Sequence, residues 1–420
     1  MISRRRFLRD GLAVATAGAV VPGFLSELAR AEGSRSRTLV VLNLAGGNDG
    51  LSTVIPYTDS FYYSRRPTIA VPAGQVLQVG TDTGGHALGL HPRLTGLRSV
   101  FDQGRLAILQ RAGYPNSSRS HFLGTDIWST ANPDVPTGPG WLGRYLDALS
   151  SADALTAWTT SSGVPRTLLS SSSNAVSAIP SASAYTLSAV NSGQDAVAAR
   201  QAVARLATNP AHDRPQLALV NASIQAAMQT LDRVATVATY TGSVAYPNSG
   251  LAQALRTVAG AMSRGIGTRI FWVQTGGFDN HSSEGVNETN GTYYGLMATL
   301  NDALLAFTTD LGNQGLLADT LLLQFSEFGR RITENGSRGT DHGAASVMLA
   351  IGGRVRGGLY GTAPSLNPDP QNPSLENAGG DVRHETDFRS VYARVIDDWL
   401  GADSRALLGG DFRSGAPRFL

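Results

Sequence analysis

The feature that most constrains the fold is a series of short apolar runs, each of which ends in a loop rich in glycine or polar residues. The first run is TLVVLNLAGGNDG, which begins at Thr38, and the later ones are RLAILQRAGYPNSSRSHF, TRIFWVQTGGFDNH, LLLQFSEFGR and VMLAIGG. They are apolar almost without alternation, which is typical of strands buried on both faces of a sheet. Helical segments separate them, so the sequence predicts an α/β fold with a mainly parallel sheet between two layers of helices.

The composition changes between about residues 150 and 250, where serine and alanine become abundant. Helices are expected within this segment at Asp195–Leu206 and Pro215–Thr239, because their apolar residues recur at helical spacing. We interpret residues 150–250 as a mostly helical insertion in one α/β domain that spans residues 32–420.

Residues 1–31 have the features of a twin-arginine signal peptide. The stretch SRRRFL at Ser3–Leu8 resembles the export motif, Leu12–Val21 is a short apolar segment, and Ala29–Ala31 fits a cleavage site. The alternative is an ordinary amphipathic helix, but three arginines ahead of an apolar run too short to cross a bilayer favour a signal. We expect cleavage after Ala31, export in the folded state, and a periplasmic or secreted protein with no integral membrane segment after signal removal.

Removing the signal segment changes the net charge of the chain. The whole chain has 34 basic and 32 acidic residues, and residues 1–31 contain five arginines against Asp10 and Glu27, which leaves 29 basic and 30 acidic residues. A balanced charge does not favour binding to nucleic acid or to an anionic membrane. The chain contains no cysteine, which excludes disulfides, thiolate metal sites and cysteine nucleophiles.

Acidic residues and histidines follow four of the predicted strands. Carboxylate oxygens and imidazole nitrogens are common ligands of divalent metals, and the carboxyl ends of parallel strands meet at one edge of a sheet. Any one of these residues alone would more often be a turn residue or a helix cap. Their recurrence after successive strands favours a metal site built from Asp49, Asp279, His281, Glu327, Asp341 and His342.

The order and spacing of these loops resemble the alkaline phosphatase superfamily, and more narrowly the exported proteins grouped as the domain of unknown function 1501 family. The stretches that carry the resemblance are LNLAGGNDGLSTVIPY, LHPRLTGLRSVFDQGRLAILQRAGYPNSSRSHF, TGGFDNH, SEFGRRITENGSRGTDHG and TDFRSVYARVIDDWLG. The resemblance implies an alkaline-phosphatase-like three-layer sandwich that holds two divalent metal ions, with zinc, magnesium, manganese and calcium as candidates.

The superfamily pattern also implies which residues bind each metal. Asp49 matches the aspartate after the first strand, and Glu327 falls where relatives usually have an Asp-His pair. Asp279, His281 and His342 match the ligands of the other metal, although the spacing from Asp279 to His281 is shorter than in alkaline phosphatases. A further acidic residue, Asp341, is expected either to bind metal or to orient the histidine that follows it.

The nucleophile of the superfamily lies at the start of the helix after the second main strand, which places it among Ser117–His121. Ser120 is the first candidate and Ser118 the second. Counting back from Trp128 reaches His121 instead, as a metal ligand or as the nucleophile itself. Arg119 is expected to clamp a phosphate or sulfate oxygen, and the alternative for the whole loop is a polar helix cap without chemistry.

Two classes of function follow from this resemblance. One is an exported metal-dependent hydrolase of a small or polymeric anionic ester, in which two metals activate the nucleophile and polarise the ester of phosphate or sulfate. The other is a non-catalytic exported metal-binding or assembly protein, with an exported partner protein. A sulfatase of the formylglycine type is disfavoured, because the chain has no cysteine to be converted.

Overall fold

The centre of the structure is a nine-stranded sheet. The computed structural model describes residues 37–149, 153–171, 176–185, 194–208, 215–369 and 371–420. In spatial order, the strands are β13 (Gly358–Tyr360), β5 (Leu106–Gly113), β12 (Ser346–Gly352), β9 (Thr320–Phe325), β1 (Thr38–Leu44), β8 (Ile270–Thr275), β6 (Ala157–Thr159) and β7 (Val176–Ala178), with β14 (Thr386–Asp387) also paired to β5. Only β12 is antiparallel to its neighbours within this path, so the predicted mainly parallel sheet is confirmed.

The central strands are buried along their whole length. All seven residues of β1 and of β12 are buried, as are all six of β9, which explains why their sequences are apolar without alternation. Along β1, Val40 and Leu42 pack into one core, and Leu39 and Val41 pack into another. Successive side chains of a strand point to opposite faces, so the sheet separates two hydrophobic cores.

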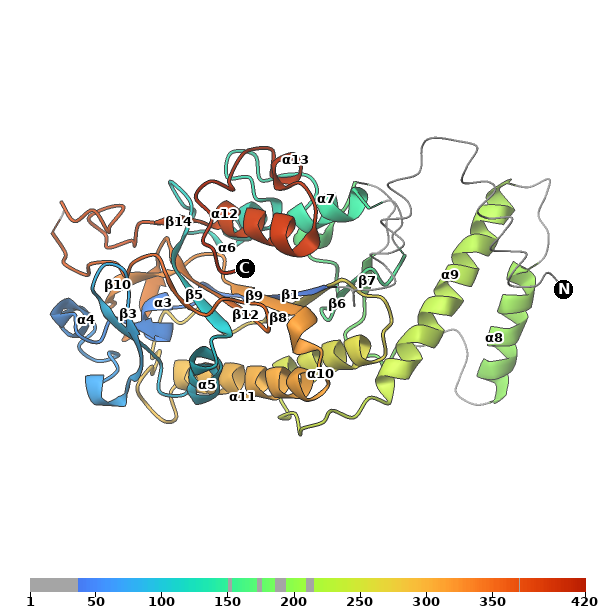
Figure 1. Cartoon of the computed structure of the whole chain (residues 1–420), viewed down its shortest axis with the longest axis horizontal. Coiled ribbons are helices and arrows are strands. Elements are labelled where there is room, and N and C mark those ends of the chain that lie inside the picture. Colours follow the sequence, from blue (N-terminus) through green and yellow to red (C-terminus); the bar gives the residue numbers. More distant parts are fainter. Residues whose placement is uncertain (1–36, 150–152, 172–175, 186–193, 209–214, 370) are drawn as a thin grey trace, which may run out of the picture. The chain divides into compact units, whose positions relative to one another are not determined.

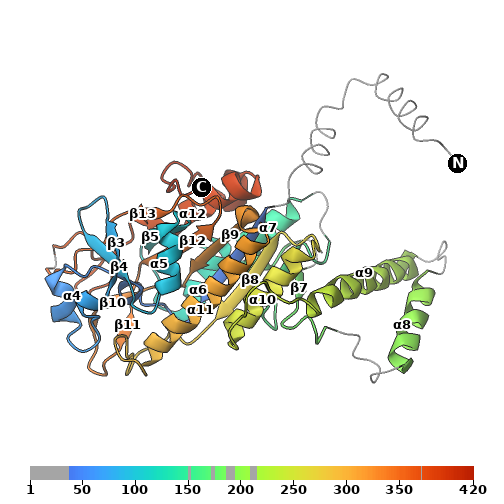
Figure 2. The same ribbon diagram turned by 60° about the horizontal axis from the view of Figure 1, so that its bottom comes forward.

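Helices cover both faces of the sheet and complete three layers (Figure 1). One layer contains α5 (Thr95–Asp102), α10 (Gly250–Ser263) and α11 (Thr292–Asn313), which lie in front of the sheet in Figure 2. The other layer contains α6 (His121–Thr130), α7 (Trp141–Asp147), α12 (Phe388–Arg394), the π-helical segment η4 (Val395–Leu400) and α13 (Ser404–Leu408). The predicted α/β sandwich is therefore confirmed.

Smaller elements surround the sheet. They are α3 (Gly50–Thr53), α4 (Ser60–Arg65), the 3-10 turns η1 (Ala73–Gln75), η2 (Arg166–Leu168) and η3 (Leu317–Asp319), a three-stranded sheet in the order β2 (Val54–Ile55), β4 (Ala87–Leu90) and β3 (Leu77–Thr81), and a hairpin of β10 (Arg330–Glu334) and β11 (Thr340–His342). The hairpin lies in the connection between β9 and β12, so it follows the edge where β9 ends.

The carboxyl ends of several strands meet at one edge of the sheet. Asn43 of β1 is aligned with Gln274 of β8 on one side and with Phe325 of β9 on the other. β12 runs in the opposite direction and begins at this edge, where Ser346 is aligned with Ala112 of β5. The loops after β1, β5, β8 and β9 and the loop before β12 therefore leave the sheet on the same side.

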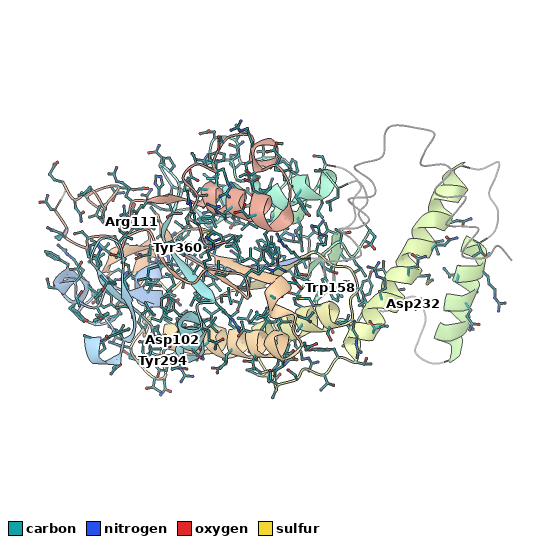
Figure 3. The ribbon with its side chains drawn as sticks, viewed as in Figure 1. Asp102, Arg111, Trp158, Asp232, Tyr294 and Tyr360 are labelled. Carbon is teal, nitrogen blue, oxygen red and sulfur yellow. The ribbon has the colours of Figure 1, made fainter. Side chains whose placement is uncertain are left out.

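The segment between residues 150 and 250 contains both helices and strands in its described part. The helices α8 (Gln194–Ala207) and α9 (Pro215–Ala238) occupy the two stretches where helices were expected. The short strands β6 and β7 extend the sheet beyond β8, which the serine- and alanine-rich composition did not indicate. Trp158 of β6, which is labelled in Figure 3, is buried. It donates its Nε1 hydrogen to the carbonyl oxygen of Ile179 at 2.9 Å.

The predicted signal peptide and its cleavage point after Ala31 lie outside the described residues. In the part of the chain that the structure describes, no helix has the length and apolar character needed to cross a bilayer.

Candidate metal centre

Four side chains from three loops converge beyond the carboxyl edge of the sheet. His121 is the first residue of α6, which follows β5; Asp279 and His281 follow β8; and His342 ends β11. Potential ligand atoms of His121, Asp279 and His342 all lie within 4.8 Å of one another. We call His121, Asp279, His281 and His342 the His–Asp cluster.

The carboxylate of Asp279 lies at the middle of the His–Asp cluster. Its Oδ1 is 3.0 Å from Nε2 of His342 and 3.0 Å from Nε2 of His281, and its Oδ2 is 3.4 Å from Nε2 of His121. The Nε2 atoms of His281 and His342 are themselves 2.9 Å apart. Three imidazoles thus direct the same ring nitrogen at one carboxylate.

An oxygen acceptor faces the other nitrogen of each imidazole ring. Nδ1 of His342 donates to the carbonyl oxygen of Arg119 at 2.8 Å, and Nδ1 of His121 lies 2.8 Å from Oε1 of Glu327. Nδ1 of His281 lies 3.5 Å from Oδ1 of Asp341. Because a carbonyl or a carboxylate only accepts, a hydrogen on Nδ1 satisfies these contacts, and a neutral ring with that hydrogen would offer the lone pair of Nε2 to a cation bound beside Asp279. This is the arrangement that outer oxygens impose on metal-binding histidines.

The electrostatics of the His–Asp cluster favour a charged carboxylate at Asp279 and a neutral imidazole at His342. Partial burial opposes ionisation of Asp279, but hydrogen bonds from Arg330 and His342 outweigh it and hold the pKa of the Asp279 carboxyl well below its usual range. Burial lowers the pKa of His342, and its hydrogen bond to Asp279 only partly offsets this. Asp279 therefore stays ionised as the pH falls, and the His342 ring loses its proton more readily than a free imidazole.

The residues present fit a divalent metal. Three imidazole nitrogens and one carboxylate oxygen form a donor set that zinc and similar transition ions accept, whereas magnesium and calcium prefer oxygen ligands alone. Nε2 of His121 is buried and makes no hydrogen bond among the described residues, with Oδ2 of Asp279 3.4 Å away. A cation between Nε2 of His121 and Asp279 would satisfy it.

Arg330 holds together the loops that carry the His–Asp cluster. Its side chain is fully buried, and it donates to the carbonyl oxygens of Gly47 and Thr340, both at 2.7 Å, and of Phe278 at 3.0 Å. It also donates to Oδ1 of Asp279 at 2.7 Å. One guanidinium therefore connects the loops after β1 and β8 to β11 and neutralises the cluster carboxylate. Arg330 was not among the residues predicted from the sequence, although the Arg-Arg pair that begins three positions after Glu327 is a signal for it.

Glu327 and Asp341 lie around the His–Asp cluster rather than in its centre. Oε1 of Glu327 accepts from the backbone nitrogen of Gly46 at 2.8 Å besides facing His121. Oδ1 of Asp341 accepts from Nδ2 of Asn335 at 3.1 Å besides facing His281. Both predicted site residues are thus placed where they orient an imidazole. Asp341 faces His281, whereas the sequence suggested that it would orient His342.

Asp49 is separate from the His–Asp cluster. Its carboxylate is buried against the fully buried guanidinium of Arg66, with Oδ1 accepting from Nη2 at 3.1 Å, and it also accepts from the hydroxyl of Ser52. The expected pairing of Asp49 and Glu327 around one metal is not seen. Arg66 supplies the positive charge that this buried carboxylate needs. Among the described residues, one group of histidines and acids has the spacing of a metal site, so the expected second site has no counterpart there.

The hydroxyl-rich loop before α6 has mixed roles. Oγ of Ser120 caps α6 by accepting from the backbone nitrogen of Leu123 at 3.5 Å, and Oγ of Ser118 accepts from the backbone nitrogen of Ser120 at 3.1 Å. The guanidinium of Arg119 is paired with Asp381 and Glu376, so the expected clamp on a substrate oxygen already has carboxylate partners. Of the four residues proposed for catalysis, His121 is the one that belongs to the His–Asp cluster.

A family sequence model described as "Protein of unknown function (DUF1501)" matches residues 106–408. No curated protein matches the chain. Solved structures that are similar include the C-terminal periplasmic domain of EcEptC from Escherichia coli in complex with Zn, at 11% identity and a TM-score of 0.33, over 76% of this chain and 74% of that one.

Two further solved structures are similar at the same level. PsFucS1 sulfatase from Pseudoalteromonas sp. is 12% identical with a TM-score of 0.34, over 93% of this chain and 71% of that one. Alkaline phosphatase from the Antarctic bacterium TAB5 is 13% identical with a TM-score of 0.32, over 78% of this chain and 95% of that one. At these TM-scores the likeness carries no argument about activity, so any function proposed for this chain rests on its own residues.

Proposed function

The chain belongs to the DUF1501 family of proteins of unknown function, and we propose that it is an exported, metal-dependent hydrolase of phosphate or sulfate esters. The observation that supports this proposal is the convergence of three imidazole Nε2 atoms on the carboxylate of Asp279. A cluster of this kind at the carboxyl edge of a parallel sheet lies where α/β proteins build their reactive sites.

His121, Asp279, His281 and His342 would hold one divalent ion. When bound, such an ion withdraws electron density from an ester oxygen and makes a nearby hydroxyl more acidic. Zinc is the best match to the donor set. Oxygens of Glu327, Asp341 and the carbonyl of Arg119 lie beside Nδ1 of the three imidazoles, which would leave each Nε2 lone pair for the ion. The buried Arg330 keeps the Asp279 carboxylate ionised and fixed.

The substrate would be a small or polymeric ester that carries a phosphate or sulfate group. Ser120 lies at the N-terminus of the ten-residue helix α6, one residue before His121. Backbone N–H groups at a helix N-terminus favour an anion, and the exposed Ser120 hydroxyl is our first candidate for the attacking group. Ser118 is the second candidate.

A screen of the purified protein tests this proposal. We expect divalent metal to copurify with the chain and turnover of at least one aryl phosphate, phosphodiester or aryl sulfate. Ser120→Ala is expected to keep its metal and its fold but to lose about three orders of magnitude or more in kcat, because only the covalent step is removed. Ser118→Ala is the matched control and should keep most of the activity.

The outcomes of this screen separate the candidates. Full activity in Ser120→Ala with loss in Ser118→Ala would make Ser118 the nucleophile in place of Ser120. Full activity in both variants would exclude both serines as the nucleophile. Metal binding without turnover of any ester would leave the second function, a non-catalytic exported metal-binding or assembly protein with a protein partner. One observation favours that second function: the guanidinium of Arg119 is paired with Asp381 and Glu376.

Export is a separate part of the proposal and rests on residues 1–31. The SRRRFL motif, the short apolar segment and the small residues at Ala29 and Ala31 support a twin-arginine signal. We expect the exported protein to begin at Glu32 when its N-terminus is determined by mass spectrometry. Replacing Arg4 and Arg5 together by lysine should retain the protein in the cytoplasm. An N-terminus well away from Glu32, or export of the Lys-Lys variant, would contradict this part of the proposal.

A further inference from the structure

Asp381 is a buried carboxylate that joins two distant arginines. Its side chain is fully buried, its Oδ2 accepts from Nε of Arg119 at 2.5 Å, and its Oδ1 accepts from Nε of Arg331 at 3.3 Å. Nδ2 of Asn377 also donates to Oδ2, at 2.7 Å. A buried carboxylate is costly unless it is paired, so this arrangement fixes both guanidinium groups with respect to one anion.

The first arginine connects Asp381 to His342. The guanidinium of Arg119 is held by Asp381, by Glu376 at 3.4 Å and by the carbonyl oxygen of Ser117 at 3.1 Å. The main-chain carbonyl of the same Arg119 accepts from Nδ1 of His342 at 2.8 Å. Because the side chain of Arg119 is fixed at three points, its carbonyl is also restrained, and this carbonyl determines which nitrogen of His342 carries the hydrogen.

The second arginine connects Asp381 to His281. Nη1 of Arg331 lies 3.7 Å from Oδ2 of Asp341, and Oδ1 of Asp341 lies 3.5 Å from Nδ1 of His281. These contacts are longer than those of the first arginine, so we expect the second connection to be the weaker of the two. Both connections end on the Nδ1 side of an imidazole whose Nε2 faces Asp279.

We propose that Asp381 is a positioning residue of the metal centre, which sets the orientation and tautomer of His342 through Arg119 and of His281 through Arg331 and Asp341. This inference rests on the metal binding in the proposed function. It assigns a role to the segment before β14, which contributes no residue to the His–Asp cluster. It also explains why the guanidinium of Arg119 pairs with Asp381 and not with a substrate oxygen.

Metal affinity measured on the folded protein tests the inference without any assay of activity. Partners that orient a metal-binding histidine typically change the metal affinity by about 10–100-fold. Asp381 acts on the histidines through Arg119 and Arg331 and not by direct contact. We therefore expect the zinc dissociation constant of Asp381→Asn to rise by about tenfold, the lower end of this range. The visible absorption spectrum of the Co²⁺-loaded protein should change as well, because the imidazoles are no longer held in one orientation.

A matched control separates positioning from a general loss of stability. Asp310 is also fully buried and accepts hydrogen bonds from Tyr240, Tyr246 and Ser243, none of which contacts the His–Asp cluster. We expect Asp310→Asn to lower the thermal midpoint at least as much as Asp381→Asn, while its zinc dissociation constant and its Co²⁺ spectrum stay those of the unaltered protein.

Two further variants test the connections separately. Arg119→Met removes the first connection and Arg331→Met the second, so both should weaken zinc binding, Arg119→Met more strongly. An unchanged dissociation constant in Asp381→Asn overturns the inference, and if that variant does not fold, unchanged constants in both arginine variants overturn it. If the unaltered protein binds no divalent metal, the proposed function itself fails, which is a distinct result.

Discussion

His342→Ala will weaken binding of zinc by about 10²–10³-fold. Zinc bound by four protein ligands contributes about 10–16 kcal/mol, or about 2.5–4 kcal/mol per ligand, and each 1.4 kcal/mol corresponds to a factor of about ten. Nε2 of the side chain removed lies 2.9 Å from Nε2 of His281 and 3.0 Å from Oδ1 of Asp279. Equilibrium competition with a chromophoric chelator measures this loss.

His86→Ala is the matched control for this substitution. His86 also pairs with an aspartate, Asp82, at 3.1 Å, but it lies outside the His–Asp cluster. We expect its zinc affinity to be unchanged. A chelator should lower the thermal midpoint of the unaltered protein and of His86→Ala but have little effect on His342→Ala, because ligands stabilise only the state that binds them. Equal zinc affinity in all three proteins would rule out a centre that depends on His342.

Arg330→Met will lower the free energy of unfolding by about 3 kcal/mol or more, because three buried carbonyl oxygens each lose their donor at a cost of about 1–3 kcal/mol. The substitution leaves the carbonyls of Gly47, Phe278 and Thr340 without their donor and the Asp279 carboxylate without its cation. Methionine keeps much of the side-chain volume, so the loss reports on polar contacts rather than on a cavity. Urea denaturation followed by circular dichroism measures it.

Arg354→Met is the comparison for the Arg330 variant. Arg354 is half exposed and pairs with Asp319 at 3.0 Å, and exposed ion pairs contribute about 0–1 kcal/mol. A loss below about 1 kcal/mol in Arg330→Met as well would mean that the loops of the His–Asp cluster hold together without this guanidinium.

The sequence predicted the sheet because the burial of a strand is visible in its own residues. A strand covered on both faces shows no alternation of apolar and polar residues. This pattern is found in all three central strands, Thr38–Leu44, Thr320–Phe325 and Ser346–Gly352. The direction of a strand relative to its neighbours, by contrast, cannot be read from its local sequence. β12 runs antiparallel to β9, so the end of one and the start of the other lie at the same edge, which explains why polar residues flank both runs on the side of their connection.

The sequence also identified the members of the His–Asp cluster as candidates, because their residue types and their positions after strands are local properties. Their pairing is not local. Glu327 contacts a histidine 206 positions away, and Asp381 contacts an arginine 262 positions away. Which carboxylates face an imidazole and which face a guanidinium depends on the loops that the sheet brings together.

Asp49 is the clearest case of a residue whose role only the tertiary structure decided. Its position after β1 in a glycine-rich loop is that of a metal ligand, and its local sequence contains nothing against that role. The fold buries Arg66 beside it, and a buried carboxylate next to a buried guanidinium is neutralised without a metal. The sequence determined the strands, the edge where the loops meet and the residue types available there, since these follow from short-range patterns. The tertiary structure decided which charges meet, because the energy of a buried charge depends on partners that are distant along the chain.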